Sequence, residues 1–182
     1  MLQIEELKQE LLAQQPKIEY LKEALGYQKL LEQKKQLDEQ AAQPDFWNDV
    51  ENTKKVLKEQ KTVNEKVGSY ENLVRMYEDA QTMLELAAEE EFDSEEEQEN
   101  FLQDIRSSLK EIAQRIEEEK LSALEAAQEQ VAAAFARGDI GADKYQAFQR
   151  EIEETRGKLN KYKADLSDLQ TEQDALSQNT AR

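Results

Sequence analysis

The side chains that could take part in chemistry in this chain are mainly carboxylates. The 182 residues include 41 Asp and Glu and 24 Lys and Arg, but no histidine and no cysteine. A carboxylate pair can act as general acid and general base only where burial or a neighbouring charge separates the two pKa values. The pairs here lie on expected solvated helix faces, and the commonest general base, histidine, is missing. We therefore expect no catalytic site and no enzyme.

The densest group of carboxylates lies at residues 85–99, which hold nine acids and no base. Such a run can attract divalent cations, but residues 89–99 lack the spacing and the glycine of a calcium-binding loop. The chain also has no glycine-rich phosphate-binding loop. We interpret the run as solvated charge around a helix start, and we expect no metal and no cofactor.

Net charge and hydropathy narrow the classes of function. The formal charge is −17, with 15 basic and 29 acidic residues in 1–118 and 9 and 12 in 119–182. This field repels phosphate backbones, so we expect no direct nucleic-acid binding by the surface as a whole. A local basic patch could still touch RNA if other parts held it. No apolar run approaches about 18 residues, which predicts no membrane span. We expect a cytoplasmic protein.

The composition is typical of long helices. Charged residues make up 36% of the chain and hydrophobic residues 38%, and only five glycines and two prolines occur. We predict an all-α fold, an elongated antiparallel helical bundle or coiled coil with a thin core. Residues 1–118 should form one helical domain, and residues 119–182 a coiled-coil helical hairpin.

Apolar spacing predicts the first two helices. The first should run from about residue 2 to 41, kinked or broken at Pro16, because proline lacks the amide N–H and clashes with the preceding turn. The second should begin near Trp47, and it could bend at Gly68. Its buried stripe is expected to consist of Val56, Val63, Val67, Tyr70, Val74, Tyr77 and Leu84.

A third helix is predicted from Ser94, which has capping-box spacing to Glu97. Beyond Ile116 the apolar phase slips by two residues, which suggests that the packing partner changes there. The residues expected to be buried before that point are Leu102, Ile105, Leu109, Ile112 and Ile116.

Two glycines predict a turn at residues 137–141. Arg137-Gly138-Asp139 also spells an integrin-recognition tripeptide, which we interpret as part of the turn alone. The last helix should fold back antiparallel on the helix that ends at Phe135, although pairing with another copy in a homo-oligomer is left open. Its apolar seam is Tyr145, Phe148, Ile152, Thr155, Leu159, Tyr162, Leu166, Leu169, Gln173 and Leu176.

The candidate site is the tract that interrupts the helices between the first two stripes, namely Pro44, Asp45, Phe46, Trp47, Asn48 and Asp49. Proline should stop the incoming helix near Ala42, and the Asp and Asn side chains can cap the next one. We expect Phe46 and Trp47 to pack between the two helices at a structured corner. The alternative is that these rings anchor a protein partner.

Residues from about 5 to 118 resemble the N-terminal helical domain of bacterial peptide chain release factor 2. The matching elements are Leu25-Gly26-Tyr27, Leu37-Asp38-Glu39-Gln40, Pro44-Asp45-Phe46-Trp47-Asn48-Asp49, Val67-Gly68-Ser69-Tyr70-Glu71-Asn72-Leu73 and Met83-Leu84-Glu85-Leu86. This resemblance implies a few antiparallel helices that pack beside the ribosomal stalk base when the full factor binds.

The resemblance also shows that two functional elements of the family are missing from this sequence. The family reads the stop codon with a Ser-Pro-Phe element and hydrolyses peptidyl-tRNA with a Gly-Gly-Gln loop, and neither sequence occurs in this chain. We therefore expect a non-catalytic interaction module of translation termination that binds protein partners through helical faces and docks to the ribosome. Residues 126–173 more weakly resemble a phage tail tape-measure coiled coil. The alternative function is thus a structural coiled-coil protein of the tape-measure or scaffold kind.

Overall fold

The computed structural model describes residues 2–181, of residue 180 only the backbone, and this part of the chain is built from helices without a strand. The elements in order are α1 (Leu2–Ala24), α2 (Tyr27–Ala41), the 3-10 helix η1 (Phe46–Asn48), α3 (Val50–Glu89), α4 (Glu95–Arg137) and α5 (Ala142–Thr180). The predicted all-α fold is confirmed.

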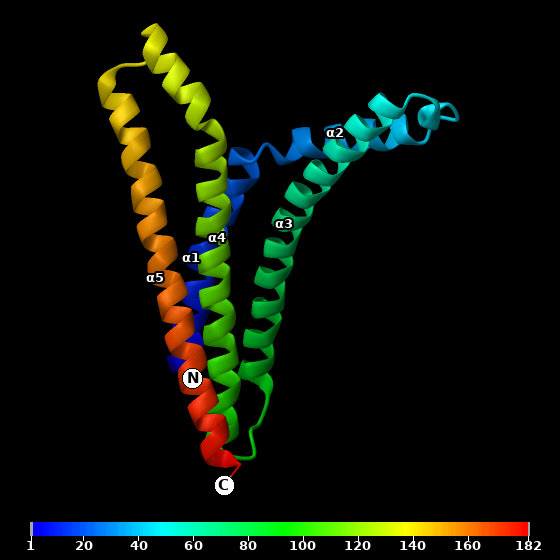
Figure 1. The fold of residues 1–182 in the computed structure, drawn as a ribbon. Helices are drawn as coiled ribbons and strands as arrows, with labels where there is room; N and C mark the ends of the chain where they lie inside the picture. The colour runs from blue at the N-terminus through cyan, green and yellow to red at the C-terminus, as the bar shows by residue number, and fades with distance from the viewer. Residues whose placement is uncertain (1, 182) are drawn as a thin grey trace.

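The helices form a body and a projecting arm (Figure 1). In the body, α1 packs against α3 and α4, and α5 returns along α4. The arm, residues 27–67, consists of α2, η1 and the first part of α3, and it points away from the α4–α5 hairpin. Because α3 continues from the arm into the body without interruption, one helix belongs to both parts.

Helix α1 continues through Pro16, so of the kink or break expected at this residue the break does not occur. The missing N–H of Pro16 deprives the Leu12 carbonyl of its amide donor. Leu12 and Pro16 both lie on the exposed side, where water can bind that carbonyl. On the opposite side Leu11 and Ile18 are both buried in the body core, so packing holds the helix together across the proline.

The break occurs instead at Gly26, where the backbone is left-handed with φ +63°. A residue with a side chain is strained in this conformation, whereas glycine has no Cβ and adopts it readily, so glycine permits the turn. The Gly26 amide donates to the Glu23 carbonyl, and α2 begins at Tyr27. The predicted single helix over residues 2–41 is therefore two helices.

Two separate apolar cores hold the body and the arm. The body core contains fifteen buried residues of α1, α3 and α4, and the arm core contains Leu37, Phe46, Val56, Val63 and Val67. Along α3 the stripe predicted from the sequence is correct as far as Tyr70 and again at Leu84. Between these two residues Leu73 and Ala80 are buried, whereas Val74 and Tyr77 are only partly covered, because α3 faces two helices of the body there.

Helix α4 begins as predicted, with the Ser94 hydroxyl accepting a hydrogen bond from the Glu97 amide at 3.1 Å. All five residues expected to be buried before the phase slip are buried. After Ile116, the one further buried residue of α4 is Glu117, and the end of the helix stands beside α5 (Figure 1). The phase slip thus coincides with the end of the body core.

The turn between α4 and α5 also lies where the glycines predicted it. Gly138 has φ +80°, and its amide and that of Asp139 bind the last carbonyls of α4. Rings from both helices then stack, with the centroids of Phe135 and Tyr145 4.5 Å apart. Ile152, Thr155 and Leu159 are the buried residues of the predicted seam, and they face α4 of the same chain.

Candidate interaction surfaces

The corner at residues 44–49 is a compact turn fixed by main-chain hydrogen bonds. The Phe46 amide donates to the Gln43 carbonyl, and the Asn48 amide donates to the Asp45 carbonyl, closing η1. Asp49 then caps α3, because its side chain accepts a hydrogen bond from the Asn52 amide at 3.2 Å. The corner is therefore structured on both sides, and it forms the tip of the arm.

A buried threonine ties the corner to the first turn of α3. The Thr53 hydroxyl lies 2.5 Å from the Phe46 carbonyl oxygen and 2.8 Å from that of Asp49. Thr53 is 7% exposed, so these contacts are shielded from water. A hydroxyl has one proton to donate, which it can share between the two carbonyls. This link holds η1 at a fixed angle to α3.

The two aromatic rings of the corner have opposite environments. Phe46 is 4% exposed and belongs to the arm core, as expected. Trp47 is 69% exposed, so the expectation that its ring packs between the helices is wrong. The reason is geometric, because consecutive residues of a tight turn point in different directions and the narrow arm core holds one ring. The two rings contact each other edge to face, with their centroids 5.1 Å apart and an angle of 77° between their planes.

Trp47 is accompanied by other exposed apolar residues at the start of α3. Val50 is 60% exposed and Leu57 is 41% exposed, and their spacing of seven residues puts them on one face of the helix. We call Trp47, Val50 and Leu57 the arm-tip patch. The other predicted residues of the corner, Pro44, Asp45, Asn48 and Asp49, are exposed around it.

The sequence of most of the arm and of part of the body matches a known family. Residues 30–133 match the PCRF domain, and they make up more than half of the chain. The chain belongs to the PCRF domain family. The match contains the whole corner and all of α3, and it ends within α4, so α5 lies outside the matched PCRF domain.

A curated relative agrees with this PCRF domain assignment. Over 97 residues the chain is 32% identical to peptide chain release factor 2 of Nautilia profundicola, an alignment that covers 53% of this chain and 26% of the relative. The chain thus spans about a quarter of the length of that relative. The predicted resemblance to release factor 2 is confirmed. No solved structure was found to match this one.

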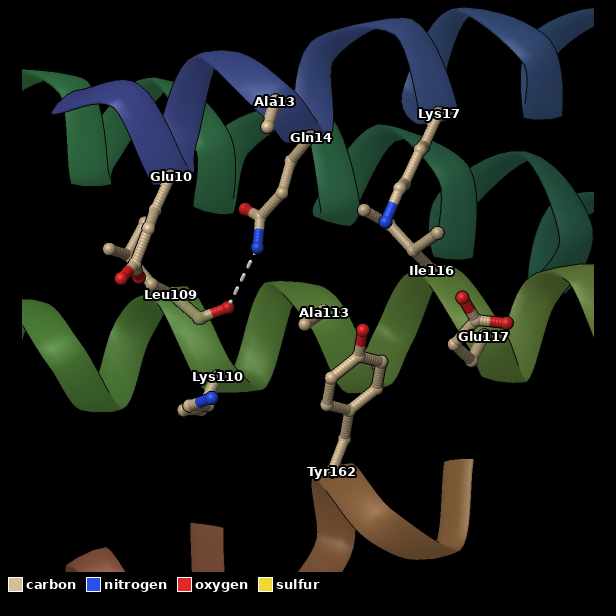
Figure 2. A pocket seen from close by; sticks show the side chains of 10 residues that line it. All are labelled: Glu10, Ala13, Gln14, Lys17, Leu109, Lys110, Ala113, Ile116, Glu117 and Tyr162. Atoms are coloured by element: carbon tan, nitrogen blue, oxygen red, sulfur yellow. Dashed lines mark hydrogen bonds between the residues drawn. The ribbon is translucent and has the colours of Figure 1, made fainter. Parts of the chain in front are cut away.

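The body carries a groove between α1, α4 and α5 with a volume of about 200 Å³ (Figure 2). On its α1 wall the Gln14 side-chain amide donates to the Leu109 carbonyl at 3.1 Å. This bond orients the amide group, and the Gln14 Oε1 atom is left without a hydrogen-bond partner in the described chain. Tyr162 of α5 points into the groove from the other side.

Glu117 lies at the end of the same groove and is 3% exposed. One of its carboxylate oxygens has no hydrogen-bond partner among the described residues. Burial is the main cause that raises the pKa of Tyr162, and the negative charges of Glu117 and Asp165 raise it further. Lys110 balances part of this charge, since its ammonium group lies 3.8 Å from the Asp165 carboxylate.

The groove was not predicted from the sequence, although two patterns point to it. Gln14 occupies a position of the apolar stripe between Leu11 and Ile18, and Glu117 directly follows the last residue of a stripe. Within residues 2–181 no group of His, Cys, Asp or Glu is arranged to hold a metal ion. In the same part of the chain, every helix is too short or too polar to cross a bilayer.

Proposed function

We propose that this chain is a non-catalytic, release-factor-like module that docks to the bacterial ribosome through the tip of its arm. The observation that carries the proposal is the exposure of Trp47 on a rigid corner. Exposed tryptophans held in one orientation are common anchors of protein interfaces, because a large ring is buried on binding at a small cost in side-chain entropy.

The relative supports the ribosome as the docking partner. Its name describes a peptide chain release factor, and the PCRF match includes the corner and the arm-tip patch. The family match and the relative favour this function over that of a tape-measure or scaffold protein. We further propose that the module acts in the cytoplasm and performs no reaction of its own, since its carboxylates lie mainly on exposed helix faces.

Sedimentation with purified bacterial 50S subunits through a sucrose cushion at moderate salt tests this proposal. We expect the wild-type chain to pellet with the subunits. Trp47→Ala should weaken this binding at least tenfold, because hot-spot aromatics contribute about 2 kcal/mol or more to an interface. Tyr20→Ala is the matched control, since Tyr20 is 58% exposed but lies on α1 of the body.

Two results would contradict the proposal. One is a wild-type chain that pellets no more than an unrelated helical protein of equal net charge. The other is equal loss of binding in Trp47→Ala and Tyr20→Ala, because binding would then not be located at the arm tip. Circular dichroism of both variants checks that each remains folded.

A further inference from the structure

The net negative charge of the protein comes from the body. Residues 27–67 contain eight lysines and eight carboxylates, so the arm is neutral. The remaining residues contain 16 basic and 33 acidic side chains and carry the whole net charge of −17. Charges separated by more than about 10 Å of solvent are largely screened at physiological salt. Because the arm projects away from the body, its local charge pattern decides what can approach it (Figure 1).

One face of the arm is a groove between α2 and α3, with a volume of about 360 Å³. Its apolar part comes from Leu30 of α2 and Val63 of α3. Lys55, Lys58 and Lys66 line the same groove from α3, and Glu59 is the one carboxylate among the lining residues. The groove therefore has a local charge of +2 in a strongly acidic protein. We call it the lysine groove.

The lysines of this groove have no ion-pair partner in the part of the chain that the structure describes. None of the three lysines forms an ion pair with a carboxylate of residues 2–181, and all three are exposed. Lys55 and Lys66 are eleven positions apart on α3, which corresponds to about 16 Å along the helix axis. A row of free ammonium groups of this length matches several carboxylates placed along one side of an extended or helical segment.

We propose that the lysine groove binds an acidic amphipathic segment of a partner protein. Apolar side chains of this segment would cover the half-buried Leu30, and its carboxylates would pair with Lys55, Lys58 and Lys66. An amphipathic helix in a groove is a common mode of peptide recognition, with contacts that repeat every three or four residues. The inference extends the proposed docking role, but it does not depend on the arm-tip patch.

The apolar floor favours a protein segment over a nucleic acid. A phosphate backbone would pair with the lysines and leave the exposed part of the Leu30 side chain in water, whereas Val63 is already buried in the arm core. A long polyanion would also extend beyond the arm toward the −17 charge of the body, and this repulsion lowers its affinity. A short acidic segment with its own apolar face meets neither difficulty.

Fluorescence anisotropy with a designed 16-residue helical peptide tests the inference. The peptide carries leucines on one face and glutamates on the other, and titration is done in 50 mM and 200 mM salt. We expect saturable binding that weakens at the higher salt concentration. Lys55→Glu/Lys58→Glu should weaken binding at least tenfold, and Lys66→Glu alone should have a smaller effect. Lys161→Glu/Lys163→Glu on α5 is matched in charge and should change affinity less than twofold.

Further variants of the peptide and of the protein separate the contributions of the apolar contacts, the lysine charges and the arm-tip patch. A peptide with serine in place of leucine should bind at least tenfold more weakly. Lys55→Gln/Lys58→Gln, which removes the charge without reversing it, should also weaken binding, and it keeps the test valid if the double glutamate variant unfolds. Trp47→Ala should bind the peptide as the wild type does, so that loss of ribosome docking and loss of peptide binding are distinguishable.

Three outcomes would overturn the inference. The first is the absence of saturable peptide binding. The second is tighter binding of a single-stranded RNA of equal charge that is lost in the same lysine variants, which would assign the groove to nucleic acid. The third is a concentration-dependent increase in mass of the protein alone that Lys55→Glu/Lys58→Glu abolishes, which would assign the groove to a second copy of the chain.

Discussion

Phe46 and Trp47 are adjacent in the chain and their rings touch edge to face at 5.1 Å, yet the first is buried in the arm core and the second projects into solvent. The two neighbouring rings of the corner therefore have different structural environments. Phe46 packs between α2 and α3, and the Trp47 ring is exposed at the tip of the arm.

This difference predicts opposite effects on stability. Phe46→Ala should lower the free energy of unfolding by about 3–5 kcal/mol, the usual loss for a buried aromatic ring. Trp47→Ala should change it by less than about 1 kcal/mol, because the ring is mostly exposed. Urea denaturation followed by circular dichroism measures both values. Equal losses in the two variants would show that the indole is also buried in solution.

Gly26, at the break between α1 and α2, and Gly68, inside α3, should respond in opposite directions to substitution by alanine. Gly26→Ala forces a side chain into a left-handed backbone and should cost about 1–2 kcal/mol. Gly68 lies inside α3, with no atom within 4 Å of an added Cβ, so Gly68→Ala should stabilise by up to about 1 kcal/mol. Thermal melts of both variants provide the comparison. A destabilised Gly68→Ala protein would indicate that α3 is not continuous at this residue.

The Thr53 hydroxyl should contribute to the stability of the corner. Thr53→Val keeps the shape of the side chain but removes the donor to the Phe46 and Asp49 carbonyls, and we expect a loss of about 1–3 kcal/mol. Thr62→Val is the control, because Thr62 is exposed and its hydroxyl binds a carbonyl of its own helix. A loss no larger than that of the control would argue against the buried contacts.

Alkaline pH should lower the free energy of unfolding, because tyrosine hydroxyl groups ionise there. Burial is the largest cause that raises the pKa of Tyr70, Tyr77 and Tyr162, whereas for Tyr27 it is the hydrogen bond from the hydroxyl to Glu71. A raised folded-state pKa means that the neutral phenol is favoured in the fold. The resulting stability is complete below about pH 10 and decreases as the pH rises further.

Urea midpoints at pH 8 and pH 10.5 measure this effect. Tyr162→Phe should reduce the difference between the two midpoints, because it removes one of the groups that must ionise. An unchanged difference in this variant would mean that Tyr162 ionises equally easily in the folded and unfolded chain.

Much of the fold follows from local patterns in the sequence. The stripe from Leu102 to Ile116, the Ser94 cap and the turn at Gly138 are all confirmed, because each depends on residues close together in the chain. The corner was also located correctly, since a proline next to capping residues ends one helix and starts another.

The remaining features depend on contacts between distant segments. Pro16 is tolerated because packing on both sides of it keeps α1 continuous, and this packing cannot be seen in the local sequence. The same holds for the choice of Leu73 over Val74 on α3, which is set by the positions of α1 and α4. The exposure of Trp47 depends on how much space the arm core offers, and the sequence contains no measure of that space.

Helix α3 packs into the arm core at one end and against α1 and α4 at the other. The helix is continuous from the corner to the body, although it curves along its length (Figure 1). A partner bound at the tip would therefore be joined to the body through a single unbroken helix.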